Sequence, residues 1–301
     1  MSSLDDLFVQ IAKRNPLQRV FLSTLHQGGS FSEKDRQGLG HYVDYALDSG
    51  ETLDDLAASY DQIVRDTLRE QIFFRRHDRY RHARFEDIAQ SVYFDPAYMS
   101  RYMHGLALTA FLWPNHAAIR HHFASVLESV PHEKRRRYLE VGPGHGFYLT
   151  AASRAGFEHV EGIDLSPTSV ALTKRIVESG RFGSGEACVI REGDFLEASF
   201  DEPFDMLVMG EVLEHVEEPL RFLSRLRELA CEDATIYVTT CASSPAVDHI
   251  YLFRSVDEVS LMAEEAGFRV RDVLALPHHG TTLEESTRAR LPINIALVLS
   301  P

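Results

Sequence analysis

The chain has 301 residues, a length that suggests about two domains, and its 44% hydrophobic and 25% charged residues are typical of globular proteins. Its formal net charge of −14 makes nucleic acid and anionic membranes unfavourable partners, because an acidic surface repels phosphate groups. The sequence has no apolar run of about 18 residues and starts with an acidic segment unlike a signal peptide, so we expect no membrane span and a cytoplasmic protein.

Residues 1–130 are predicted to form an all-helical domain. In the stretch 52–74, apolar residues recur every three or four positions, at Leu53, Leu56, Tyr60, Ile63, Leu68 and Ile72. The stretch 94–123 is rich in aromatic residues, and these either pack a core or form a lid over a ligand. The candidates for lining a substrate pocket are Tyr98, Tyr102, His104, Trp113 and His116. A homodimer, if one forms, is expected to use this domain.

Residues 131–301 are predicted to form a second domain of class α/β. Short apolar strands alternate with amphipathic helices, a pattern typical of a doubly wound, mainly parallel Rossmann-like sheet. We expect seven strands, near 136–142, 159–166, 188–194, 204–211, 235–241, 268–277 and 293–300. No helix is predicted between the last two strands, which are therefore expected to pair antiparallel.

A glycine-rich turn, "LEVGPGHG", follows the first strand of this domain. In such sheets ligands bind at the carboxyl ends of the strands, and Gly142, Gly144 and Gly146 would let the backbone approach one closely. A dinucleotide fingerprint would have a small residue where this chain has Phe147. Glu140 would repel a pyrophosphate but attract the ammonium of an amino acid. The turn therefore favours S-adenosylmethionine over a dinucleotide.

Acidic residues also follow the second and third strands. Asp164 is suitably placed for a ribose diol, and Asp194 for an adenine amino group with Phe195 stacking nearby. The alternative is that both aspartates only cap their loops.

These stretches, with "GIDLS", "GDF" and "FDMLVMGEVLEHVEEP", resemble the successive motifs of class I S-adenosylmethionine-dependent methyltransferases. The resemblance covers about residues 136–301 and implies that family's strand order, with an antiparallel last strand. The cofactor contacts expected from it are Glu140, Gly142, Gly144, Gly146, Asp164, Leu165, Asp194, Phe195 and Glu211.

The stretch "GEVLEHV" carries the candidate catalytic groups. Glu211, Glu214 and His215 are spaced to share one face of a helical turn, and His249 is expected at the same sheet edge. Together the four could bind a divalent metal, and the arrangement resembles that of metal-assisted O-methyltransferases in ubiquinone biosynthesis and small-RNA end modification. Alternatively the pair at 214–215 only shapes the loop, or His215 is a metal-free general base.

Histidines at two further positions are also candidates for the site. His145, inside the glycine turn, is expected to pack or to touch the cofactor, and "HHG" at 278–280 is a weaker candidate for a ligand or base. The sequence thus predicts a methyltransferase that transfers a methyl group in line, favouring an oxygen of a small metabolite. The alternatives are N- or C-methylation, an NAD-dependent oxidoreductase, which Phe147 and Glu140 disfavour, and a non-catalytic nucleoside-binding module.

Overall fold

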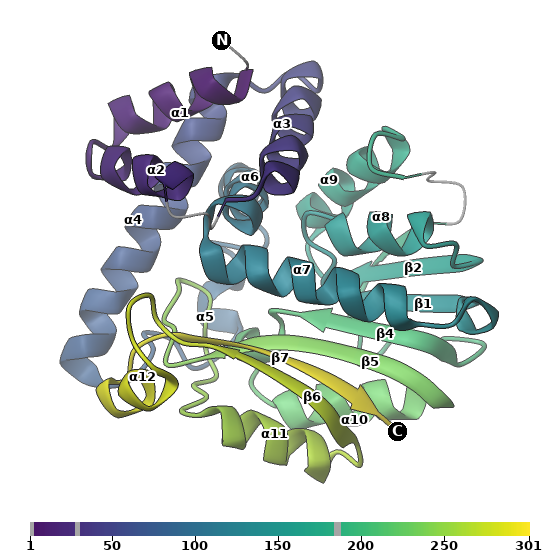
Figure 1. The fold of residues 1–301 in the computed structure, drawn as a ribbon. Helices are drawn as coiled ribbons and strands as arrows, with labels where there is room; N and C mark the ends of the chain where they lie inside the picture. The colour runs from purple at the N-terminus through teal and green to yellow at the C-terminus, as the bar shows by residue number, and fades with distance from the viewer. Residues whose placement is uncertain (1–2, 28–30, 184–187) are drawn as a thin grey trace.

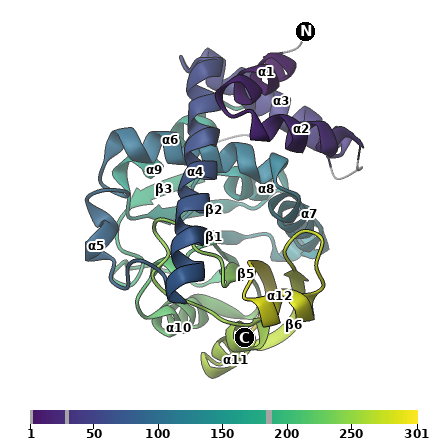
Figure 2. The ribbon, with the colours of Figure 1, turned by 90° about the vertical axis from the view of Figure 1, so that its left-hand side faces the viewer.

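The computed structural model describes residues 3–27, 31–183 and 188–301. Its N-terminal part is helical, as predicted, and Figure 1 shows these helices in purple and blue beside the sheet. They are α1 (Ser3–Arg14), α2 (Leu17–Gln27), α3 (Glu33–Asp48), α4 (Leu53–His77), α5 (Glu86–Ala89) and α6 (Pro96–Leu112). Figure 2 shows α4 crossing in front of the strand ends.

The buried face of α4 follows the predicted apolar stripe only in its first half. Leu68 and Ile72 lie in the predicted helix but are 53% and 45% exposed. The inward face continues instead through Glu70 and Phe74, which are 2% and 4% exposed. The Glu70 carboxylate can be buried because it pairs with the Arg81 guanidinium at 2.9 Å.

The second part contains the predicted seven-stranded sheet, with strand order β3-β2-β1-β4-β5-β7-β6. Neighbours among β1 to β5 pair in parallel, and β7 pairs antiparallel with both β5 and β6, which confirms the predicted topology. The strands are β1 (Arg137–Val141), β2 (His159–Asp164), β3 (Cys188–Glu192), β4 (Phe204–Gly210), β5 (Ala230–Ala242), β6 (Arg269–Leu276) and β7 (Ile293–Ser300).

A short helix, α12 (Leu283–Ala289), lies between β6 and β7, where none was predicted. It begins at a capping box in which the Glu285 carboxylate accepts a hydrogen bond from the Thr282 backbone N–H at 2.8 Å, while the Thr282 hydroxyl accepts one from the Glu285 N–H at 3.2 Å. Threonine followed three residues later by glutamate is a known helix start, so the sequence carried the signal.

Helices cover both faces of the sheet. Figure 1 shows α7 (Pro114–Ser129), α8 (Phe147–Arg154) and α9 (Pro167–Glu178) on one face, and α10 (Pro219–Leu229) and α11 (Val256–Glu265) on the other. A 3₁₀ turn, His132–Lys134, precedes β1.

Although α7 lies within residues 1–130, it packs on the sheet. The Phe123 ring stacks on Tyr148 at 4.0 Å between centroids and lies 5.3 Å from the ring of Tyr237 in β5. The helix α7 therefore belongs to the layer of helices that covers one face of the sheet.

Phe147 joins the glycine turn to the helical part of the chain. Its ring is 8% exposed and lies 5.6 Å from Tyr42 of α3 and 5.3 Å from Phe111 of α6, edge to face in both cases. A large side chain at this position therefore docks the helices against the turn, which explains the absence of the small residue typical of dinucleotide sites.

Candidate functional site

A cavity of about 570 Å³ lies where the carboxyl ends of the parallel strands meet α4, α6 and α7. Its sheet side is lined by the turns after β1, β2, β3, β4 and β5. The helices α4, α6 and α7 supply its other wall. The volume is in the range of small-molecule sites, roughly 300–1,000 Å³.

The glycine turn forms the floor beside β1. Gly142 has φ 65°, and a Cβ there would lie only 2.9 Å from Cγ2 of Val212. Gly144 has φ 51°, and the nearest atom to its Cβ position is Cε of Met103 at 3.5 Å, across the cavity. Both glycines line the cavity with left-handed φ angles that favour glycine.

Glu140 lies at this floor, 3% exposed. Its carboxyl accepts a hydrogen bond from the Tyr138 hydroxyl at 3.0 Å, and burial raises its pKa to about 8. A carboxyl with this pKa is mostly protonated at neutral pH, and a ligand ammonium would restore its charge.

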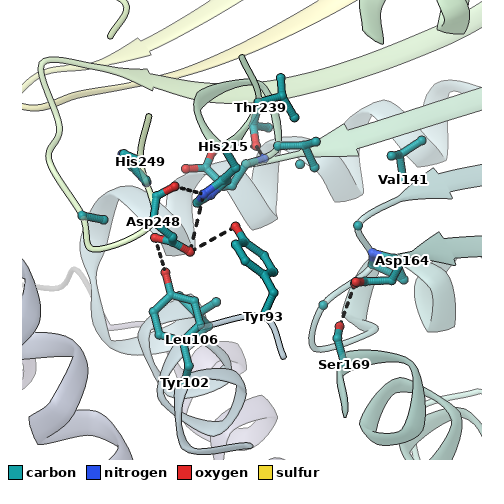
Figure 3. A pocket seen from close by; sticks show the side chains of 18 of the residues that line it. Tyr93, Tyr102, Leu106, Val141, Asp164, Ser169, His215, Thr239, Asp248 and His249 are labelled. Atoms are coloured by element: carbon teal, nitrogen blue, oxygen red, sulfur yellow. Dashed lines mark hydrogen bonds and ion pairs between the residues drawn. The ribbon is translucent and has the colours of Figure 1, made fainter. Parts of the chain in front are cut away.

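Asp164, at the end of β2, faces the cavity and also caps its loop. Its carboxylate accepts a hydrogen bond from the Ser166 backbone N–H at 2.9 Å. It accepts another from the Ser169 hydroxyl at 2.7 Å, which Figure 3 shows. Burial raises the pKa of this carboxyl. Both readings of Asp164 are thus compatible with the structure. The neighbouring Leu165 also lines the cavity and is 37% exposed.

The turn after β3 brings Asp194 and Phe195 to the cavity wall. Asp194 is exposed and accepts a hydrogen bond from the Leu196 backbone N–H at 2.8 Å, so it too caps its loop. Phe195 is 4% exposed and packs against Phe222 of α10, with 5.9 Å between ring centroids.

The prediction that Glu211, Glu214 and His215 share one face of a helical turn is wrong. Glu211 leaves β4 with a left-handed φ of 53°, and the 3₁₀ turn Leu213–His215 follows. Glu211 is held in this conformation by Thr239, whose hydroxyl donates to its carboxylate at 2.8 Å and whose backbone C=O accepts its N–H at 2.9 Å. Such a backbone outlier in a non-glycine residue is common at functional sites.

Glu214 points into the protein. It is fully buried, is not among the described residues that line the cavity, and accepts a hydrogen bond from the Thr240 hydroxyl at 2.6 Å. Burial, and then the charge of Glu211, raise the pKa of the Glu214 carboxyl well above its usual range.

His215 faces the cavity and is paired with Asp248, a residue that the sequence analysis missed. Its Nδ1 lies 3.1 Å from the Asp248 carbonyl oxygen and 3.4 Å from the carboxylate (Figure 3). Both are acceptors, so Nδ1 carries the hydrogen and Nε2 has the lone pair. Among the described residues Nε2 has no hydrogen-bond partner, and it is therefore free to accept a proton.

His249 lies beside this pair, with its ring 4.8 Å from that of His215 and edge to face. Its Nδ1 lies 2.6 Å from the Ser244 carbonyl oxygen, so it also carries its hydrogen there. Burial, and then the charge of His215, lower the pKa of His249 to about 3, which keeps the ring neutral.

The four predicted metal ligands do not form one cluster. Within the described ranges, two groups have candidate ligand atoms within 4.8 Å of one another. One is Glu214 with Cys241 and His249, and the other is His215 with Asp248 and His249. Glu211 belongs to neither, because its left-handed backbone turns it toward Thr239.

Three of the five candidate pocket residues border the cavity. Tyr102, Trp113 and His116 line the cavity, as do residues that the sequence analysis did not name: Tyr93, Met99, Met103 and Leu106. Tyr98 instead stacks behind Tyr102. His104 turns toward α3, where its Nδ1 lies 2.7 Å from the Tyr42 hydroxyl.

The two remaining histidine positions differ. His145 lines the cavity and stacks on Phe147 at 4.3 Å, and burial lowers its pKa to about 3. His278 and His279 are exposed and line no part of this cavity, so the structure does not bring them to the site.

Residues 115–273, more than half of the chain, match the model of a family described as "Methyltransferase domain". The ubiquinone biosynthesis O-methyltransferase of Neisseria meningitidis serogroup A / serotype 4A is 25% identical over 163 residues, which cover 48% of this chain and 68% of the relative. The enzyme of the same name from Actinobacillus pleuropneumoniae serotype 7 is 33% identical over 110 residues, or 35% and 45% of the two chains.

Solved structures with the same fold include the mitomycin 7-O-methyltransferase MmcR, with a TM-score of 0.53 and 16% identity over 83% of this chain and 70% of that one. PigF with SAH has a TM-score of 0.54 and 15% identity over 83% and 74%. Within the described residues, no helix has the length and apolar character to cross a bilayer.

Proposed function

Because the chain belongs to the class I S-adenosylmethionine-dependent methyltransferases, we propose that it methylates a hydroxyl oxygen of a small aromatic molecule. The observation that carries this proposal is the free Nε2 of His215, which faces the cavity while Asp248 holds the other side of the ring. Methylation of a hydroxyl requires removal of its proton, and an imidazole held in this way suits that task. Membership of this family decides against the NAD-dependent and non-catalytic alternatives.

We place the cofactor along the sheet side of the cavity. Glu140 would pair with its ammonium, Asp164 would bind the ribose diol, and Asp194 with Phe195 would hold the adenine. Glu140 supports this placement, because its buried carboxyl lines the cavity and would regain its negative charge beside a ligand ammonium. The other residues proposed to border the cofactor are Gly142, Gly144, Gly146, Leu165 and Glu211.

His215 would act as the general base. Its Nε2 takes the hydroxyl proton as the oxygen attacks the methyl carbon and the carbon–sulfur bond breaks, giving a methyl ether and S-adenosylhomocysteine. The Asp248 carboxylate then stabilises the imidazolium. A positioned base typically contributes about 10²–10⁴-fold, and alignment of the reacting atoms contributes the larger share.

The helical wall supports an aromatic acceptor. The side chains of Tyr93, Met99, Tyr102, Met103, Leu106 and Trp113 border the cavity opposite the glycine turn. Aromatic rings and methionine sulfur pack well against flat apolar molecules. The names of the curated relatives and of MmcR agree with transfer to oxygen. N-methylation would use the same geometry. The identity of the methylated product distinguishes it from O-methylation.

A divalent metal is a second proposal, now resting on His215, Asp248 and His249. The hydrogen bond from His249 Nδ1 to a backbone carbonyl is typical of metal-binding histidines, and it leaves Nε2 as the ligand atom. When bound, the metal would lower the pKa of the acceptor hydroxyl. Exhaustive EDTA treatment separates the two proposals: activity lost and restored by Mg²⁺ supports the metal, and full activity supports the base alone.

A homodimer through the helical part remains a proposal. It is supported by α2, where Leu17 and Val20 are 80% and 68% exposed. Light scattering on the wild type and a Leu17→Asp, Val20→Asp variant tests it, since only a dimer held by this surface would dissociate in the variant.

The experiment for the proposed function is transfer of a labelled methyl group from S-adenosylmethionine to catechol, phenol and aniline. We expect an O-methyl product, with kcat reduced about 10²–10⁴-fold in His215→Gln. The exposed His279→Gln is the matched control and should match the wild type. An N-methyl product alone, or full activity of His215→Gln, would contradict the proposal.

A further inference from the structure

A second group of polar side chains lines the cavity, away from the pair of His215 and Asp248. Arg120 and His116, one turn apart on α7, border it together with His145 of the glycine turn. Burial, and then the charges of His116 and Arg120, lower the pKa of His145, so the three groups are close neighbours. The proposed chemistry and the proposed cofactor contacts use none of them.

The Arg120 guanidinium is fixed by contacts outside the cavity. Its Nη2 pairs with the fully buried Asp35 carboxylate of α3, and its Nε donates to the Ala110 carbonyl oxygen at 3.3 Å. Its central carbon lies 4.4 Å from the centre of the Phe111 ring. Its Nη1 has no hydrogen-bond partner among the described residues. Because arginine is always charged, this nitrogen can donate to an anion in the cavity.

His145 is a second fixed donor. Its Nδ1 accepts a hydrogen bond from the Phe147 backbone N–H at 3.4 Å, so the hydrogen of the neutral ring is on Nε2. The ring stacks on Phe147 with 4.3 Å between centroids, which holds its orientation.

We propose that Arg120 and His145, with His116 beside them, form a subsite for a carboxylate of the acceptor, which is then an aromatic hydroxy acid. This inference rests on the proposed function, because it names the class of acceptor for the same cavity.

The charges around the subsite favour an anion over a neutral oxygen. A neutral oxygen would also accept a hydrogen bond from His145, but only an anion gains from the permanent charge of Arg120. Asp35 balances that charge from the side of α3 and leaves Nη1 unpaired. Glu211 is the competing carboxylate on the sheet side, and it is engaged by the Thr239 hydroxyl at 2.8 Å.

The position of the subsite favours the acceptor over the cofactor as the source of the carboxylate. The cofactor is proposed to lie along the turns after β1, β2 and β3. His116 lies toward β4 instead, since burial lowers its pKa while the charge of Glu211, directly after β4, raises it. Its ring is 5.0 Å from that of Trp113, which belongs to the proposed acceptor wall.

The test compares protocatechuate, a catechol that carries a carboxylate, with its neutral amide, protocatechuamide. Isothermal titration of each into the complex of the protein with S-adenosylhomocysteine gives the ratio of their affinities without any turnover. The variants are Arg120→Met and His145→Phe, the second of which keeps a ring against Phe147. Asp35→Asn is the matched control, because it breaks the same ion pair but retains Arg120.

We expect the wild type to bind protocatechuate about 10- to 100-fold more tightly than the amide, the usual value of a charged hydrogen bond. Arg120→Met should reduce this ratio to about threefold or less, and His145→Phe should weaken protocatechuate binding about 3- to 10-fold. Asp35→Asn should keep at least the wild-type ratio, because Arg120 loses a competing anion. The affinity of Arg120→Met for S-adenosylhomocysteine should equal that of the wild type.

Equal affinities of the wild type for the acid and the amide would overturn the inference, as would a ratio that Arg120→Met leaves unchanged. Weaker binding of S-adenosylhomocysteine by Arg120→Met, with the acid-to-amide ratio intact, would assign the subsite to the cofactor and also refute it. Should Arg120→Met fail to fold, the double variant Asp35→Asn, Arg120→Met and the single variant His145→Phe decide the question. The proposed function fails separately, if His215→Gln keeps full activity, and that result does not alter the affinity ratio.

Discussion

Replacement of Glu140 by glutamine tests the electrostatic match between the cofactor and the sheet. With a pKa of about 8, Glu140 is mostly protonated in the free protein at pH 7 and must ionise to pair with an ammonium. Binding should therefore release most of a proton at pH 7 and less at pH 8. The affinity of the wild type should rise between these two pH values.

Isothermal titration with S-adenosylhomocysteine, which keeps the ammonium, measures this release in buffers of different ionisation enthalpy. Glu140→Gln should show no such proton release, and at pH 9 it should bind about 10- to 100-fold more weakly, the cost of losing a charged hydrogen bond. The exposed Glu192→Gln is the control. Equal proton release or equal affinity in Glu140→Gln and the wild type would refute the reasoning.

The raised pKa of Glu140 also makes the stability of the folded protein depend on pH. Burial raises the pKa of Glu140 from 4.5 to about 8, so the folded protein holds the proton more tightly than the unfolded chain. The stability of the free protein should therefore fall as the pH rises from 4.5 toward 8, by up to about 5 kcal/mol. Glu140→Gln removes this loss, so urea unfolding at pH 9 should find the free variant more stable than the wild type while its ligand affinity is lower.

Two other substitutions follow from the glycine turn. Phe147→Ala should cost about 3–5 kcal/mol in urea unfolding, because the ring fills the contact between α3, α6 and the turn. Stability unchanged within about 1 kcal/mol would contradict that packing role. Gly142→Ala should weaken S-adenosylhomocysteine binding at least about tenfold, since its Cβ would lie 2.9 Å from Val212. Gly280→Ala, with φ 81° and open space around it, is the control and should bind normally.

The sequence was informative wherever a local pattern decides the structure. The sheet followed from strand–helix alternation, and the glycine turn from its residues, because both depend on short-range backbone preferences. Phe147 indicated the right class of cofactor. Its packing against α3 and α6 could not be predicted, because those helices are far away in the sequence.

The proposed catalytic arrangement was harder to predict because it depends on one backbone angle. The spacing of Glu211, Glu214 and His215 is that of a helix, yet Glu211 adopts a left-handed φ, and Glu214 turns into the protein. Asp248 directly precedes His249 in the sequence, but its pairing with His215, 33 residues earlier, comes from the fold. Such contacts leave no periodic signal in the sequence.

A crystal structure with S-adenosylhomocysteine and catechol would test the central claim most directly. We expect the ammonium beside Glu140 and a catechol oxygen between the sulfur and Nε2 of His215. A complex in which the sulfur faces away from His215, or in which the ammonium lies far from Glu140, would contradict the account.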